Sequence, residues 1–195
     1  MRGLFRASLG KFEIDAVVCC AGIIGEITDA ENINIDKFTA CINSSVLGTM
    51  LFVKNFSSVF KKKKKGNFIL LSSFAALRGT ALMPAYVASK YAINGLMKSF
   101  ARELGPWGIR VNSILPGLID SNMARSIFYQ LKSRLNVKID VSDQDLIDSE
   151  FIRSIPLGRL GQGKDINNLV MFLISDASSY IHGSMISIDG GLQVK

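Results

Sequence analysis

Tyr86 and Lys90 are the side chains whose types and spacing first indicate chemistry. They stand four residues apart at the start of a stretch with helical periodicity, so both lie on one helix face. A free tyrosine has a pKa of about 10 and is a poor base near neutral pH. A lysine ammonium within several ångströms favours the phenolate and is expected to lower that pKa. The pair therefore predicts a tuned phenol that exchanges a proton with a substrate oxygen.

Ser73 is the third candidate side chain. It follows an apolar run at residues 67–72 and precedes Tyr86 by 13 residues. A hydroxyl at that place can hold a substrate oxygen in position. The three groups together suit the interconversion of a carbonyl and an alcohol, with a cofactor moving the hydride. Taken alone, the Tyr-x-x-x-Lys spacing is more typical of a half-buried tyrosine beside a solvated lysine, so the surrounding elements must decide.

Apolar, β-branched runs alternate with helical patterns along the chain. Helices are expected over most of 28–60, at 85–104 and at 165–174, while the polar segment 121–155 predicts one or two mobile helices. This order is typical of an α/β fold with a doubly wound parallel sheet and right-handed crossovers. Ligands of such sheets bind beyond the carboxyl ends of the strands. Buried strands are expected at residues 14–20, 67–72, 109–115 and 185–188.

The ends of the first long helix have their own signals. Asp36 is a candidate cap at its start. The run Lys61–Lys65 followed by Gly66 is expected to end it, because cations suit a helix C-terminus and glycine suits the turn after it.

The segments at the predicted strand ends form an ordered set of motifs. They are DAVVCCAG at 15–22, LSS at 71–73, YVASK at 86–90, GIRVN with PG at 108–117, Ser and Met at 121 and 123, and ISIDGG at 186–191. In this order, and over essentially the whole chain, they resemble the short-chain dehydrogenase/reductase family. The resemblance implies a Rossmann-like fold and an oxidoreductase that moves a hydride between NAD or NADP and a ketone or secondary alcohol.

The resemblance also implies roles for individual residues. Tyr86 would be the general acid/base, Lys90 would lower its pKa and hold the nicotinamide ribose, and Ser73 would orient the substrate carbonyl. The cofactor-binding residues implied in the same way are Ala21, Gly22, Tyr86, Lys90, Pro116, Gly117, Ile119 and Ser121. Residues 121–155 would form a lid over the small-molecule substrate, and long helices would pair across subunits in a homo-oligomer, a dimer or tetramer.

The chain departs from the family pattern at its beginning. Family members start with a strand and a Thr-Gly-x-x-x-Gly-x-Gly phosphate loop, and the sequence contains no such motif. The resemblance therefore implies one N-terminally truncated domain over residues 1–195, without the first βαβαβ part. We expect weak cofactor binding and an uncovered apolar strand edge at residues 17–20. A non-catalytic scaffold or oligomerisation protein of the same fold stays open as the alternative.

Two further departures affect the predicted site. Cys19 and Cys20 replace the family's Asn-Asn pair, and thiols cannot donate comparable hydrogen bonds. Reactive-cysteine chemistry is the alternative interpretation, although buried strand cysteines are usually inert. Ser45 stands where the family's helix has an asparagine that holds a water in the proton relay, and a serine would hold it less firmly.

Composition limits the other function classes. The formal net charge of +7 includes the five-lysine run, which favours a solvated turn over a nucleic-acid site. The three cysteines lack metal-ligand spacing and there is one histidine (His182, expected to be an ordinary loop residue), so no zinc site or other metal is expected. No apolar stretch is long enough to cross a membrane. Sparse cysteines fit a reducing compartment, and we expect a cytoplasmic location, with a weak targeting segment in residues 1–12 as the alternative.

The substrate is harder to predict. Three cations in the expected lid would suit an acidic substrate, and exposed helix charges explain them equally well. They are Lys132, Arg134 and Lys138.

Overall fold

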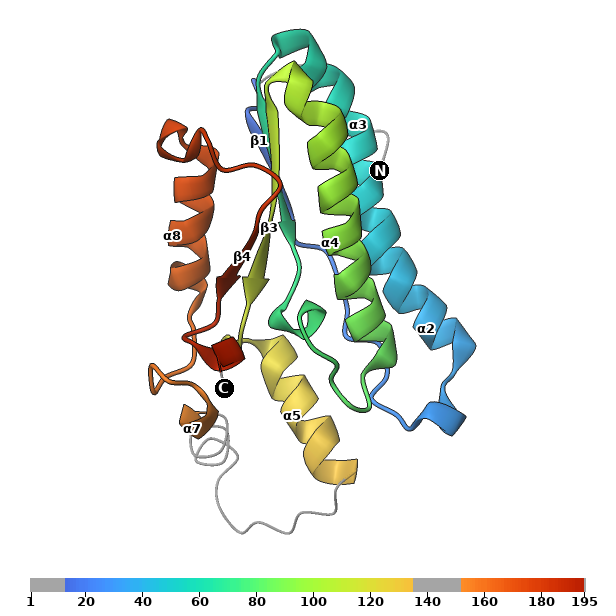
Figure 1. Cartoon of the computed structure of the whole chain (residues 1–195). Helices are drawn as coiled ribbons and strands as arrows, with labels where there is room; N and C mark the ends of the chain where they lie inside the picture. The colour runs from blue at the N-terminus through green and yellow to red at the C-terminus, as the bar shows by residue number, and fades with distance from the viewer. Residues whose placement is uncertain (1–12, 135–151, 195) are drawn as a thin grey trace.

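A parallel sheet of four strands forms the centre of the protein (Figure 1). The structure is a computed structural model, and it describes residues 13–134 and 152–194. All three strand pairs are parallel, and the spatial order is β1-β2-β3-β4. The four predicted strands are thus confirmed. Their bounds are β1 Ala16–Cys19, β2 Gly66–Leu71, β3 Ile109–Pro116 and β4 Met185–Ile188.

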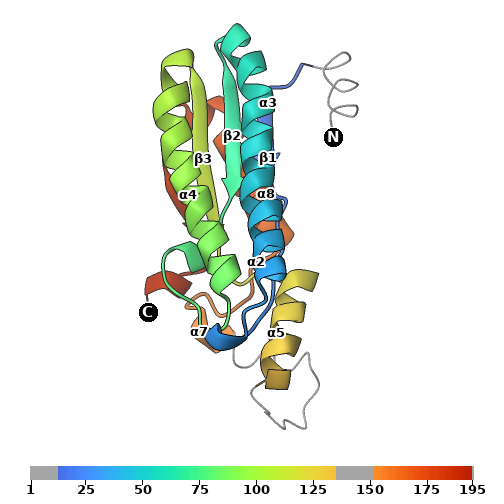
Figure 2. The same ribbon diagram turned by 90° about the vertical axis from the view of Figure 1, so that its right-hand side faces the viewer.

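Helices cover both faces of this sheet, which confirms the doubly wound arrangement (Figures 1 and 2). The helices α3 and α4 lie on one face, and α8 lies on the other. The helix α5 lies beyond the carboxyl ends of the strands. The α-helices are α2 Ile35–Ile42, α3 Gly48–Lys63, α4 Pro84–Leu104, α5 Asn122–Arg134, α7 Ile152–Ser154 and α8 Gly163–Ile174.

Short helical turns fill the connections. The segment Asn43–Leu47 is a π-helical turn that joins α2 to α3 in one continuous rod. The 3₁₀ turns are Ala30–Asn32, Phe74–Ala76, Gly105–Trp107, Asp176–Ser178 and Leu192–Val194. In the predicted lid, α5 and α7 are described, and residues 135–151 lie outside the described residues.

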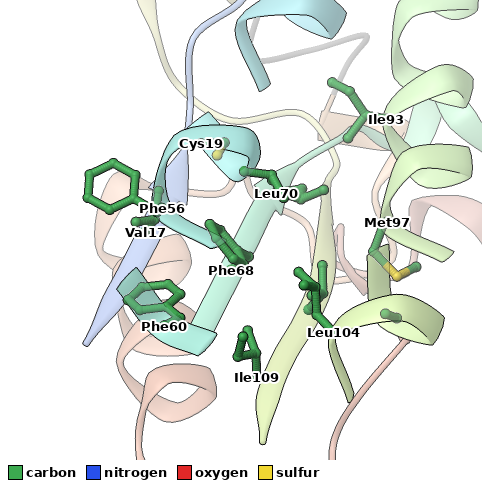
Figure 3. Close-up of a cluster of buried hydrophobic side chains, with 13 residues drawn as sticks. Val17, Cys19, Phe56, Phe60, Phe68, Leu70, Ile93, Met97, Leu104 and Ile109 are labelled. Carbon is green, nitrogen blue, oxygen red and sulfur yellow. The ribbon is translucent and has the colours of Figure 1, made fainter. Parts of the chain in front are cut away.

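The main core lies between the sheet and the pair α3 and α4 (Figure 3). The rings of Phe60 and Phe68 pack edge to face with centroids 5.0 Å apart. Gly66 permits this contact, since a Cβ on it would lie 2.3 Å from the Phe60 ring. On the other face, Leu173 of α8 covers Ile69 and Ile114. Because side chains on both faces are buried, the central strands form continuous apolar runs.

The helix ends differ from the prediction in two places. The side chain of Asn34, not Asp36, caps α2, and it accepts a hydrogen bond from the Lys37 amide at 3.0 Å. Asp36 lies inside the first turn, where its charge complements the helix dipole. The helix α3 ends at Lys64, which adopts the left-handed conformation (φ 50°) expected for a glycine, while Gly66 already belongs to β2.

The lysine run makes ion pairs with acidic side chains around the same turn. Lys61 lies 3.0 Å from the Glu103 carboxylate, and Lys63 lies 2.8 Å from Asp15. The hydrogen bond and charge of Lys63 lower the pKa of Asp15. These contacts favour the interpretation as a solvated turn.

The strand β1 pairs with β2 alone among the described residues. Val17 and Cys19 point toward the helix-covered core and are buried, while Val18 is 39% exposed on the opposite side. The sequence predicts a strand edge without a neighbouring strand at residues 17–20. Among the described residues, the side of β1 that faces away from β2 is such an edge.

His182 joins α4 to β3, so the expectation of an ordinary loop residue is wrong. Its Nδ1 accepts a hydrogen bond from the Val111 amide at 3.1 Å, and its Nε2 lies 2.9 Å from the Ala101 carbonyl oxygen. These two contacts require a neutral ring with the proton on Nε2. The three partners are far apart in sequence, which is why no local pattern indicates the bridge.

We expect His182→Ala to lower the free energy of unfolding by about 1–3 kcal/mol, since it leaves the Val111 amide and the Ala101 carbonyl without their partner. Urea denaturation at pH 7 measures the effect. Tyr180→Ala, in the same loop and fully exposed, is the matched control and should change stability little. Equal effects of both variants would contradict the bridging role.

Candidate active site

A cavity of about 330 Å³ lies at the carboxyl ends of the strands. The segments after β1, β2 and β3 line it, and the start of α4 and the inner side of α5 complete its walls. Its position agrees with the general rule for ligand sites in parallel sheets. The cavity brings together the three predicted catalytic side chains Ser73, Tyr86 and Lys90.

Ser73 is held at the start of the Phe74–Ala76 turn. Its Oγ accepts a hydrogen bond from the Ala75 amide at 3.1 Å, and the residue is buried. This hydroxyl therefore keeps its own proton available for a second acceptor. Tyr86 lies in the first turn of α4, just after Pro84, and the Ser73 hydroxyl is close enough to influence the pKa of its phenol.

The electrostatics of Tyr86 differ from the prediction. Burial raises the pKa of its phenol above the ordinary value, and the interaction with the Ser73 hydroxyl only partly opposes this rise. The Lys90 ammonium lies 5.4 Å from the centre of the Tyr86 ring, and the pKa of the phenol is nevertheless raised. The prediction that Lys90 lowers the pKa of Tyr86 below its usual range is therefore wrong for this structure.

Lys90 is fixed by contacts with the end of β2. Its Nζ donates a hydrogen bond to the Leu71 carbonyl at 3.0 Å, and the Ser72 hydroxyl donates one to the Lys90 carbonyl, also at 3.0 Å. The side chain is 5% exposed. Burial lowers the pKa of Lys90 to about 8. The site thus holds a buried amine whose proton is lost in the mildly alkaline range.

The cysteines near the site are not activated. Burial raises the pKa of Cys19 to about 12. Burial also raises the pKa of Cys20, which lines the cavity, although the Lys90 charge acts in the opposite direction. Because the thiolate is the reactive form, these shifts oppose the reactive-cysteine alternative.

Ser45 lies in the π-helical turn beside Lys90. Its side chain is fully buried, and its Oγ has no hydrogen-bond partner among the described residues. A Cβ on Gly22 would lie 3.1 Å from this Oγ and 3.7 Å from the Lys90 Nζ. Gly22 therefore leaves the space between the two polar groups open.

Most of the predicted cofactor-binding residues line the same cavity. Ala21 is the exception, since it is exposed and does not line the cavity. The Ser121 hydroxyl accepts a hydrogen bond from the Ala124 amide at 3.2 Å, and so caps α5. The residues that line the cavity are Gly22, Tyr86, Lys90, Pro116, Gly117, Ile119 and Ser121.

These residues fit the nicotinamide end of a dinucleotide. The open space above Gly22 and the unpartnered Ser45 hydroxyl show a polar site next to Lys90 that a hydroxylated group can enter. Gly117 must be glycine, because a Cβ there would lie 2.7 Å from the Asp189 backbone. The sequence supplies no Gly-rich loop for the pyrophosphate.

The apolar wall of the cavity was not predicted from the sequence. Phe74 and Met83 come from the loop between β2 and α4, and Ile127, Phe128 and Leu131 come from α5. The helical spacing of the apolar residues in α5 is a signal that could have identified them.

Arg134 is the one of the three predicted lid cations whose side chain the structure describes, and its contacts do not indicate a site for an acidic substrate. Arg134 pairs with the carboxylate of Asp29 and donates a hydrogen bond to the Thr28 hydroxyl at 3.1 Å. This contact favours the alternative of ordinary helix charges. The side chain of Lys132 and the whole of Lys138 lie outside the described residues.

The described residues contain neither a metal site nor a membrane-spanning helix. Within 13–134 and 152–194, no cluster of three or more His, Cys, Asp or Glu side chains is placed to bind a metal ion. None of the helices in these ranges is both long and apolar enough to span a membrane.

Known proteins with similar sequences and structures support one family. The chain is 34% identical over 179 residues to the 2-dehydro-3-deoxy-D-gluconate 5-dehydrogenase of Bacillus subtilis (strain 168), covering 92% of this chain and 65% of that protein. The chain thus spans less than two thirds of the length of this curated relative.

Solved structures agree. Levodione reductase superposes with a TM-score of 0.90 at 27% identity, covering 98% of this chain and 72% of that chain. NAD⁺-bound xylitol dehydrogenase gives a TM-score of 0.87 at 28% identity, covering 97% of this chain and 73% of that chain. A family model described as enoyl-(acyl carrier protein) reductase matches residues 2–193. Sequence motifs, fold and matches over nearly the whole chain agree, and the protein belongs to the short-chain dehydrogenase/reductase family.

Proposed function

We propose that the protein is an NAD(P)-dependent oxidoreductase that interconverts a ketone and a secondary alcohol. One observation carries this proposal: Ser73, Tyr86 and Lys90 line a single cavity together with Gly22, at the carboxyl ends of parallel strands. The cofactor would be NAD or NADP, as the NAD⁺ bound to the similar xylitol dehydrogenase suggests. The substrate would be a small carbonyl or alcohol.

In the proposed reduction, the chain supplies the proton. A reduced nicotinamide, when bound, supplies the hydride that reaches the carbonyl carbon. The Ser73 hydroxyl donates a hydrogen bond to the carbonyl oxygen, and Tyr86 passes its phenolic proton to that oxygen. A raised pKa suits this role, since it keeps the phenol protonated at neutral pH. The Lys90 ammonium then stabilises the phenolate that forms, because its Nζ already lies over the same ring.

The proton must then be replaced from solvent. We propose that the Ser45 hydroxyl holds a water beside Lys90, in the space that Gly22 leaves open. A buried amine with a pKa near 8 can return a proton to the phenolate and take one from this water.

Replacing Ser73 by Ala tests the proposal. We expect kcat/KM for ketone reduction to fall about 100-fold, because the hydroxyl no longer orients the carbonyl oxygen. Oxidation of NADH and of NADPH, each followed by absorbance with a panel of ketones, measures the rate. Ser58→Ala, on the exposed side of α3, is the matched control and should keep full activity. Unchanged turnover in Ser73→Ala would remove Ser73 from the mechanism.

A non-catalytic scaffold is the second candidate. The observation that favours it is the lack of a Gly-rich phosphate loop anywhere in the 195 residues. Titration with NADPH distinguishes the two candidates. The fluorescence of the nicotinamide is a better measure of binding than the fluorescence of Trp107. Trp107 follows the C-terminal end of the 21-residue helix α4, roughly 30 Å along the helix from Tyr86, so it would report poorly on the site. Saturable binding favours the enzyme.

The quaternary structure and location also stay proposals. We propose a dimer or tetramer in which long helices pair, since Phe52 of α3 and Tyr91 of α4 are large exposed side chains. A cytoplasmic location and a lid formed by residues 121–155 complete the proposal, with α5 and α7 as the described helices of that lid.

A further inference from the structure

We infer that the substrate part of the cavity takes an uncharged, predominantly apolar ketone or alcohol, of alicyclic or long alkyl type, and discriminates against polyhydroxylated or carboxylated ones. This inference rests on the proposed function. It concerns the walls around the reacting oxygen, which neither the family membership nor the catalytic groups specify.

The walls beyond Ser73 and Tyr86 are made of large apolar side chains. Phe74 and Met83 come from the segment before α4. From α5, Ile127 and Leu131 face the same space and pack on the buried cluster that includes Met83. Phe128 of α5 is also buried and lines the cavity. Such a wall buries hydrocarbon favourably and offers a hydroxyl group no partner.

The charged side chains at the cavity already have partners within the protein. Arg125 and Asp120 both line it, and they bind each other with an N–O distance of 2.6 Å. The Lys90 ammonium is bound to the Leu71 carbonyl. The nearby Arg134 is paired with Asp29. To gain a cation, a substrate carboxylate would therefore have to break the pair of Arg125 with Asp120 or compete with the Leu71 carbonyl for Lys90.

Among the described residues, the reaction and the fold engage the other polar side chains of the cavity, apart from the Thr80 hydroxyl and the Cys20 thiol. Ser73 and Tyr86 address a single oxygen, and Ser121 caps α5. A polyol would thus bury several hydroxyl groups against Phe74 and Ile127 without hydrogen bonds, which disfavours its binding strongly. The apolar wall therefore selects for apolar ketones chiefly because it leaves the hydroxyl groups of a polyol without hydrogen-bond partners.

Two ketones of similar size test the inference with the protein as it is: 2-decalone, which is apolar, and 5-ketogluconate, which carries hydroxyls and a carboxylate. We expect kcat/KM for 2-decalone to exceed that for 5-ketogluconate by at least about 100-fold. A preference for 5-ketogluconate, or equal values, would overturn the inference while leaving the proposed function intact.

A variant at the cavity rim sharpens the test. Met123 lines the cavity and is 38% exposed, so a lysine is tolerated there without burying its charge. Met123→Lys should reduce the preference for 2-decalone about tenfold or more. Tyr129→Lys, on the same helix, 47% exposed and outside the cavity lining, is the control and should leave the preference unchanged. Equal preferences in wild type and Met123→Lys would contradict the inference.

A binding measurement tests the inferred substrate class independently of the proposed oxidoreductase activity. If neither ketone is turned over, the panel of ketones tests the proposed function separately, and saturation-transfer NMR of 2-decalone and 5-ketogluconate decides the inference. Magnetisation transfer to 2-decalone but not to 5-ketogluconate supports the apolar site. Transfer to 5-ketogluconate alone, to both, or to neither overturns it.

Discussion

Replacing Tyr86 by Phe is expected to lower kcat for ketone reduction by about a thousandfold. The variant keeps the ring, which packs against the buried cluster of Ile24, Ile27 and Met83, and removes only the hydroxyl. The substrate oxygen then lacks its proton donor, while Ser73 can still bind it. We therefore expect the loss in kcat to be much larger than any rise in KM.

The controls for this variant are on the same helix. Tyr91→Phe removes an exposed hydroxyl one turn further along α4 and should retain activity. Thermal unfolding of Tyr86→Phe should match wild type closely, which excludes misfolding as the cause. Activity within tenfold of wild type would show that another group donates the proton.

Replacing Lys90 by Met is expected to abolish turnover and at the same time to stabilise the fold. Burial lowers the pKa of Lys90 to about 8, so keeping it charged at pH 7 costs about 3 kcal/mol relative to the unfolded chain. The variant loses the hydrogen bond to the Leu71 carbonyl, worth about 1 kcal/mol. We therefore expect a net gain of about 1–2 kcal/mol in the free energy of unfolding at pH 7.

The pH dependence of stability follows from the same shift. Between pH 8 and the ordinary lysine range, the unfolded chain holds a proton that the folded chain has released, so wild-type stability relative to Lys90→Met should rise with pH. The cost of the buried charge is fully present below pH 8. Urea denaturation at pH 7, 8, 9 and 10 measures the difference between the two proteins.

The control for Lys90 is a lysine on the exposed side of α4. Lys98→Met should show neither the stabilisation nor the pH-dependent difference from wild type. A Lys90→Met variant that is less stable than wild type at pH 7 would show that the ammonium contributes more to the fold than its burial costs.

The centre of the sheet could be predicted from the sequence because its strands β2 and β3 are buried on both faces. Continuous apolar runs, such as the one that contains Phe68 and Leu70, indicate such strands without any knowledge of their neighbours. The helix α4 was predicted to within one residue, since its apolar periodicity ends at Gly105-Pro106. Local signals therefore determined most of this architecture.

The candidate site could be predicted only in part. Parallel strands and chain order brought Ser73, Tyr86 and Lys90 together, and this follows from topology. The direction of the Tyr86 pKa shift depends on burial, which arises from packing and cannot be seen in the spacing of two residues. The contacts of His182 with Ala101 and Val111 likewise depend on tertiary structure alone.

Isotope transfer tests most directly whether this site reduces carbonyls with a tyrosine proton. Wild-type protein is incubated with 2-decalone and with NADPH or NADH deuterated at C4 of the nicotinamide, and the alcohol is analysed by mass spectrometry. We predict deuterium on the carbinol carbon of the wild-type product and a loss of product formation in Tyr86→Phe. Product that lacks deuterium, or equal amounts of product from the two proteins, would contradict the proposed mechanism.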